Sequence, residues 1–188
     1  MKFKDLREFI SFLENKGELR RITAPVSHEL EITEIADRVI KAGGPALLFE
    51  NVTGFDTPLL VNMYGSHQRV AWALGVEHVD DLVGRVEGLL DLMQGPPKGI
   101  LNKLRTLGQL IQMGSFQPKT VNNGPCQEVV IQGDDVDLYK FPILKCWPLD
   151  GGPFITLPLV ITKDPETSIQ NYGTYRMQVY DKQTTGMH

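Results

Sequence analysis

The densest group of side chains that could do chemistry lies in eight residues, Ile169–Arg176, with the sequence I-Q-N-Y-G-T-Y-R. They supply a carboxamide, a glycine, a hydroxyl, a phenol and a guanidinium: Asn171, Gly173, Thr174, Tyr175 and Arg176. Arginine clamps an oxyanion with paired hydrogen bonds, glycine lets the backbone approach an anion, and an asparagine oxygen is a hard ligand for a divalent cation. These residue types are suited to binding a phosphorylated ligand. The alternative without a ligand is an edge-strand Asn at a turn and an Arg lying over a sheet.

The flanking residues predict that this motif enters a strand. Phe154–Thr162 is an apolar, β-branched run, Lys163–Ser168 is a turn cluster with an Asp-Pro, and Tyr172–Tyr180 is a second strand-like run. We therefore expect a hairpin whose return strand begins at Asn171.

Alternation along that strand would place two sets of side chains on opposite faces. One face would carry Asn171, Gly173 and Tyr175, and the other would carry Tyr172, Thr174 and Arg176. A bulge at the glycine would instead let Asn171 and Arg176 converge.

Hydrophobic periodicity predicts the elements before this hairpin. Helices are expected over Asp5–Asn15, Glu31–Lys41, a segment capped by Ser66, Asp80–Met93 and Ile100–Met113. Strands are expected over Glu18–Val26, Ala46–Glu50 and Leu59–Asn62. This order predicts a mixed α/β domain.

A turn-rich stretch near 114–125 is typical of a domain boundary. We expect a mixed α/β domain over residues 1–118 and a β-rich domain over 119–188. Within the second domain, further strands are expected at Gln127–Gln132 and at Val136–Leu138.

The composition excludes several classes of function. The 188 residues carry a net charge of -4 with no block of Lys or Arg, so nothing indicates binding to nucleic acid or to an anionic membrane. The first ten residues alternate charged and apolar types rather than forming a signal peptide, which predicts a cytoplasmic protein.

Other residues that could do chemistry have simpler interpretations. Gly43-Gly44 is expected to end a helix rather than to hold a phosphate. The acidic run Asp134–Asp137 is expected to be a solvated loop. Cys126 and Cys146 lack disulfide or zinc spacing and are expected to be buried, reduced thiols. Three isolated histidines are expected at the surface: His28, His67 and His78. Trp147 is expected to pack against the core of the second domain, with the wall of a pocket as the alternative.

Several motifs together resemble the UbiD-type decarboxylases that use prenylated FMN. The strongest is N-Y-G-T-Y-R-M-Q, preceded by L-P-L-V-I-T-K-D-P-E-T and followed by T-G-M-H. Shorter matches are L-E-I-T-E-I-A-D-R, G-G-P-A-L-L-F-E-N, P-C-Q-E-V-V, G-D-D-V-D-L and F-P-I-L-K-C-W-P. The likeness covers nearly the whole chain.

This resemblance implies a carboxy-lyase acting on an aromatic or α,β-unsaturated acid, with 3-polyprenyl-4-hydroxybenzoate of quinone biosynthesis as the best-known family substrate. It implies that Arg176 is catalytic, that Asn171 binds a divalent metal, Mn²⁺, and that K⁺ is a further candidate ion. The implied cofactor-binding residues are Asn171, Thr174, Tyr175, Arg176 and His188. A flavin prenyltransferase would supply the cofactor, the assembly would be a homo-oligomer, and a membrane surface would be met only through a lipid-like substrate.

The family's glutamates and proton donor lie further along its chain than His188. The resemblance therefore implies an N-terminal domain and the first strands of a split β-barrel, as a gene fragment, a split subunit or a truncated chain would have. The 188 residues alone are expected to be inactive; activity would point to a donor among Glu128, Asp134 and Asp137. A non-catalytic binding or assembly module and a plain FMN-binding oxidoreductase remain as alternatives.

Overall fold

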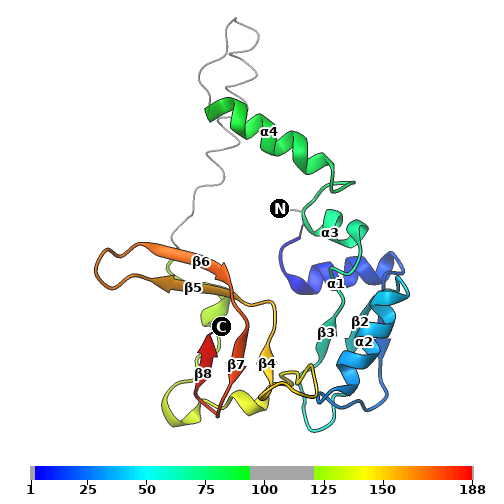
Figure 1. The fold of residues 1–188 in the computed structure, drawn as a ribbon, viewed down its shortest axis with the longest axis vertical. Helices are drawn as coiled ribbons and strands as arrows, with labels where there is room; N and C mark the ends of the chain where they lie inside the picture. Colours follow the sequence, from blue (N-terminus) through cyan, green and yellow to red (C-terminus); the bar gives the residue numbers. More distant parts are fainter. Residues whose placement is uncertain (1–2, 94–120, 188) are drawn as a thin grey trace, which may run out of the picture.

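A computed structural model describes residues 3–93 and 121–187 (Figure 1). The first range forms a three-stranded sheet with helices, and the second forms two smaller antiparallel sheets. This element order confirms the predicted mixed α/β class. The expected helix over Ile100–Met113 and most of the boundary stretch lie outside the described residues. No helix within the described ranges has the length and apolar character needed to cross a membrane.

The helices expected within the described residues are all present. They are α1 (Leu6–Asn15), α2 (Glu31–Lys41), α3 (His67–Ala73) and α4 (Asp81–Met93). The Ser66 hydroxyl accepts a hydrogen bond from the Arg69 backbone N–H at 3.2 Å, which confirms the predicted N-cap of α3. Gly43 follows α2 with a φ of 66°, so this glycine ends the helix as expected.

The first sheet has the order β1-β2-β3, with strands Leu19–Ile22, Ala46–Phe49 and Leu59–Val61. β1 is parallel to β2, and β3 is antiparallel to β2. β1 is shorter than the expected Glu18–Val26, and Val26 makes only an isolated bridge to Val52.

β2 is buried on both faces because helices cover both sides of it. Ala46 and Leu48 pack with Phe9 and Leu13 of α1. The alternate residues of β2 pack with Ile32 of α2. Since successive strand residues point to opposite faces, α1 and α2 lie on opposite sides of the sheet.

Residues 121–150 contain short 3₁₀ turns where strands were expected. The turns are Pro125–Gln127, Gly133–Asp135 and Leu138–Lys140, so the predictions of strands at Gln127–Gln132 and Val136–Leu138 were wrong. Pro125 removes a backbone donor, and the Asp137 carboxylate accepts the Tyr139 N–H at 3.0 Å to start a turn. Local turn chemistry outweighs the β-branched composition of this segment.

The second range joins the first through a short extended segment. Leu144 packs against the cluster beneath α2, and Lys145 bridges to Glu29. The Phe154 N–H then donates to the Leu144 carbonyl at 2.9 Å, which places the next sheet beside this segment.

The expected two-stranded hairpin is divided between two sheets. β4 (Phe154–Ile155), β7 (Met177–Val179) and β8 (Thr185–Met187) form one sheet, in the order β4-β7-β8. β5 (Leu159–Lys163) and β6 (Gln170–Thr174) form the other, which extends away from the first in Figure 1. The single strands predicted over Phe154–Thr162 and Tyr172–Tyr180 are therefore each split in two.

The split has a local cause at Leu157. Ile155 pairs with Met177 and Leu159 pairs with Thr174, so three residues, 156–158, oppose two, 175–176. One extra residue on the first strand defines a β-bulge, and Leu157, within this bulge, has a φ of 60°. The sequence allowed a bulge at Gly173, but the bulge lies on the opposite strand, at residues 156–158. This bulge bends the hairpin just before Arg176.

Candidate functional site

The β5–β6 hairpin presents Asn171 on the second residue of its return strand. The Asp164 carboxylate closes the turn by accepting the N–H groups of Thr167, at 3.0 Å, and Glu166, at 2.7 Å. These bonds lower the pKa of Asp164 from its ordinary value. The return strand begins at Gln170, one residue earlier than expected.

Asn171, Gly173 and Tyr175 share a face, as predicted. Asn171 Nδ2 donates to the Tyr175 hydroxyl at 3.3 Å. A Cβ added to Gly173 would lie 2.3 Å from Cε2 of Tyr175, so the tyrosine ring lies directly over the glycine. In this structure the missing side chain of Gly173 makes room for the ring that bonds Asn171, while close approach of its backbone to an anion stays a prediction.

Thr174 lies on the other face of the hairpin. It pairs with Leu159, and its neighbour Tyr172 pairs with Ile161. The side chains on this face are largely exposed: Leu159 69%, Ile161 57% and Tyr172 59%. The structure therefore brings Asn171 and Tyr175 together but does not bring Thr174 to them, and His188 lies outside the described residues.

Arg176 lies where the chain passes from one sheet to the other. Its Nη2 donates to Asp150 Oδ2 at 2.8 Å, and its guanidinium carbon lies 3.7 Å from the centre of the Phe154 ring. Because Phe154 pairs with Gln178, a residue two positions before Gln178 falls diagonally across the same face. The hydrogen bond to Asp150, with a smaller effect of Cys146, raises the pKa of Arg176. Arg176 is therefore a permanent cation held at the start of β7.

Asp150 is the residue of this site that the sequence did not indicate. It stands four residues before Phe154, in a Gly-rich turn that has no recognisable motif. The signal that could have indicated Asp150 is an acidic residue just before one strand, when the strand that pairs with it is preceded by an arginine. That signal becomes visible only once the register is known.

The residues present fit part of the expected cofactor and metal chemistry. Within the described residues, the Asn171 bond to Tyr175 uses the amide nitrogen and leaves the oxygen, the atom that would bind a hard cation, without a hydrogen bond. Those residues contain no group of three His, Cys, Asp or Glu that could hold a metal by itself. Asn171 is therefore a candidate for one ligand of a metal, not for a whole site.

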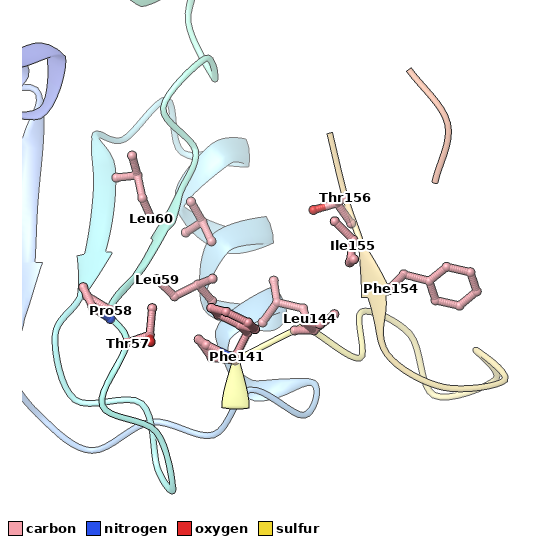
Figure 2. A pocket seen from close by; sticks show the side chains of 12 residues that line it. Thr57, Pro58, Leu59, Leu60, Phe141, Leu144, Phe154, Ile155 and Thr156 are labelled. Carbon is pink, nitrogen blue, oxygen red and sulfur yellow. The ribbon is translucent and has the colours of Figure 1, made fainter. Parts of the chain in front are cut away.

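A separate apolar pocket of about 310 Å³ lies between β3 and β4 (Figure 2). None of its lining residues carries a charge: Thr57, Pro58, Leu59, Leu60, Val61, Phe141, Pro142, Ile143, Leu144, Phe154, Ile155 and Thr156. In Figure 2 the Phe154 ring points away from Leu59 and Phe141. Arg176 stacks on that ring, so its guanidinium lies on the side of β4 that faces away from Leu59 and Phe141.

The remaining candidates have mixed outcomes. Cys126 and Cys146 are free thiols, as expected, but Cys126 is exposed and Cys146 is half-buried, so the prediction of burial was wrong. Trp147 is 57% exposed, so the prediction that it packs against the core of the second domain was wrong. It lines a pocket beside α2 with Cys146 and Pro148, as the alternative predicted. His67 and His78 are exposed, whereas His28 packs its ring 4.8 Å from that of Phe55. In the acidic run Asp134 and Asp135 are exposed, as predicted, but they lie in the 3₁₀ turn Gly133–Asp135 rather than in an irregular loop.

Two family models match this chain. Residues 10–86 match the 3-octaprenyl-4-hydroxybenzoate carboxy-lyase N-terminal domain, and residues 119–188 match the Rift-related domain of the same carboxy-lyase, UbiD. The chain belongs to the UbiD carboxy-lyase family and corresponds to its N-terminal portion.

Relatives and solved structures agree with that assignment. An uncharacterized protein of Archaeoglobus fulgidus is 50% identical over 188 residues, which is 100% of this chain and 38% of that protein. An evolved dimeric form of the UbiD-class enzyme HmfF from Pelotomaculum thermopropionicum, in complex with prFMN, has 27% identity and a TM-score of 0.75, with 99% of this chain and 38% of that chain covered. The closed form of vanillic acid decarboxylase from Sedimentibacter hydroxybenzoicus has 29% identity and a TM-score of 0.75, with 98% and 37% covered. This chain thus spans less than two fifths of each of these proteins.

Proposed function

We propose that this chain forms the opening of the cofactor site of a non-oxidative decarboxylase that acts on an aromatic or α,β-unsaturated carboxylic acid with prenylated FMN. The observation that carries the proposal is that a UbiD-family chain has, within the described residues, both an Asn171 oxygen without a hydrogen bond and a partly exposed Arg176 cation. An apolar pocket without charge, such as the one beside β4, cannot bind an oxyanion in this way.

Each residue has a distinct proposed role. The Asn171 oxygen would be one ligand of a divalent cation, Mn²⁺, which would supply positive charge for the cofactor phosphate, and K⁺ is a further candidate ion. Tyr175 would line the cofactor site and orient Asn171, His188 is a further candidate, and Thr174 would have to contact the cofactor from the opposite face of the hairpin. Arg176 binds an oxyanion and orients the carboxylate that leaves as carbon dioxide. Prenylated FMN, when bound, supplies the electrophilic carbon.

The substrate and partners are proposed from the family. The substrate we propose is 3-polyprenyl-4-hydroxybenzoate in quinone biosynthesis, and a flavin prenyltransferase would supply the cofactor. We also propose a cytoplasmic homo-oligomer, which would meet a membrane surface only through a lipid-like substrate. The exposed apolar face of the β5–β6 hairpin supports association, because unpaired apolar strands favour contact with other chains.

The test is carbon dioxide release by the complete gene product that contains this chain. The protein would be purified with prenylated FMN, with FMN or without flavin, and each form incubated with a panel of hydroxybenzoates and cinnamates. We expect release from at least one acid with prenylated FMN only. Flavin-dependent oxidation without carbon dioxide would instead identify a plain FMN oxidoreductase. Flavin-free protein that binds a partner and turns over no acid would identify an assembly module.

A further inference from the structure

The Arg176 guanidinium is fixed by a carboxylate and an aromatic ring. Asp150 Oδ2 accepts from Nη2 at 2.8 Å, and the Phe154 ring covers one face of the group at 3.7 Å. The Arg176 side chain is still 36% exposed, whereas that of Asp150 is 14% exposed. Arginine has five N–H donors in a planar fork; the bond to Asp150 uses one of its nitrogens, and Cys146 adds a weaker interaction. Donors therefore remain for a second acceptor.

Both fixing groups are themselves held in place. Asp150 Oδ2 also accepts the Trp147 backbone N–H at 3.2 Å, and the Asp150 N–H donates to the Trp147 carbonyl at 3.1 Å. These reciprocal bonds make residues 147–150 a closed turn that carries the carboxylate on a short side chain. Phe154 is buried in β4, with 7% exposure. Arg176, a long side chain with many rotamers, thus meets two rigid partners.

We propose that Asp150 and Phe154 are positioning residues that hold the Arg176 guanidinium with its remaining edge ready to bind an oxyanion, a carboxylate or a phosphate. The inference rests on the proposed role of Arg176 as an oxyanion clamp. Two parallel hydrogen bonds to an oxyanion need the plane of the guanidinium to be fixed, and fixing it before binding removes an ordering cost from the binding step. A partly exposed ion pair adds little to folding stability, so orientation is the larger effect of this pair.

Positioning and simple charge neutralisation predict opposite results for Asp150→Asn. The substitution removes a negative charge beside Arg176, so if Asp150 only neutralised the cation, anions would bind more tightly. If Asp150 orients the guanidinium, the same substitution frees a flexible side chain and anions bind more weakly. The sign of the change in affinity therefore separates the two roles.

The experiment titrates the full chain with inorganic phosphate and, separately, with benzoate. The Arg176 Nε–H resonance in ¹⁵N-labelled protein reports both the order of the guanidinium and the dissociation constant. We expect Asp150→Asn to broaden this resonance and to weaken binding by about three- to tenfold, the loss that follows when one long side chain must be ordered on binding. Asp150→Glu, which keeps the charge but moves it by one methylene, should give intermediate affinity. Asp56→Asn, a matched change at an exposed aspartate far along the chain, should have no effect.

The outcomes separate this inference from the function on which it rests. A loss confined to phosphate places the edge of Arg176 at a cofactor phosphate, and a loss confined to benzoate places it at a substrate carboxylate; either supports positioning. If Asp150→Asn and Asp150→Glu bind both anions at least as tightly as the natural chain while Arg176→Ala binds neither, the positioning role is wrong. If Arg176→Ala binds both anions normally, the clamp itself is wrong.

Discussion

Replacing Gly173 with alanine tests whether the Tyr175 ring orients Asn171. The new Cβ would lie 2.3 Å from Cε2, 2.8 Å from Cζ and 3.0 Å from the hydroxyl oxygen of Tyr175, so the ring must move. The 3.3 Å bond from Asn171 to that hydroxyl would then break. Losing this bond costs about 0.5 kcal/mol, and losing the packing of the ring costs about 0.2–1 kcal/mol. Alanine recovers about 0.5–1 kcal/mol relative to glycine in a strand.

These contributions nearly cancel, so the free energy of unfolding should change by less than about 1 kcal/mol. Binding should change more, because Asn171 would have to be ordered when the ligand binds: we expect affinity for FMN with Mn²⁺ to fall about three- to tenfold, measured by quenching of flavin fluorescence. Gly186→Ala is the matched control, since its Cβ would lie 2.3 Å from the Tyr180 hydroxyl, on a strand of the other sheet. Normal flavin affinity in Gly173→Ala, with the Tyr175 resonances shifted, would refute the reasoning.

Three further predictions concern the scaffold. Glu18→Gln should lower the free energy of unfolding by about 1–2 kcal/mol in urea denaturation, because Glu18 is the charged partner, at 2.6 Å, of an Arg69 side chain that is only 1% exposed. Glu34→Gln, in an exposed ion pair, should change the free energy of unfolding by less than about 0.5 kcal/mol, and equal effects of the two substitutions would contradict this. The folded-state pKa of Asp164 is lowered, so its contribution to the hairpin turn is present above the ordinary carboxyl pKa and is lost as pH falls through the folded-state pKa; turn amide shifts should follow this titration, and Asp164→Asn should abolish it. Leu157→Gly should raise the melting temperature, because a non-glycine residue at a φ of 60° costs about 1–2 kcal/mol; a fall of several degrees would show that the exposed leucine packs against something essential.

The helices could be predicted because their signals are local. Glu31–Lys41 has the predicted bounds of α2, and Ser66 caps α3, since both follow from periodicity and a single side chain. The division of the hairpin could not be predicted in this way. Nothing in the type of Leu157 indicates a positive φ, and the bulge becomes evident only from the pairing of strands.

In the candidate site, too, local contacts could be predicted from the sequence and contacts that depend on strand register could not. Asn171 and Tyr175 could be placed on one face by counting along a strand, and the structure brings them together. Asp150 could not be found, because its contact with Arg176 depends on the register between β4 and β7. The contact between Gly173 and the Tyr175 ring could not be predicted for a similar reason, because the side chain that lies over a glycine is known only once the neighbouring residues are placed.

Flavin occupancy tests the central claim, that Asn171 and Arg176 hold the cofactor of a UbiD-family decarboxylase, most directly. The complete gene product that contains this chain would be purified from cells that also make a flavin prenyltransferase, and flavin absorbance per protein would be measured for the natural sequence, Asn171→Ala and Arg176→Ala. We predict near-stoichiometric flavin in the natural protein and a large loss in both variants, with decarboxylation lost in parallel. Full occupancy and full decarboxylase activity in both variants would contradict the account.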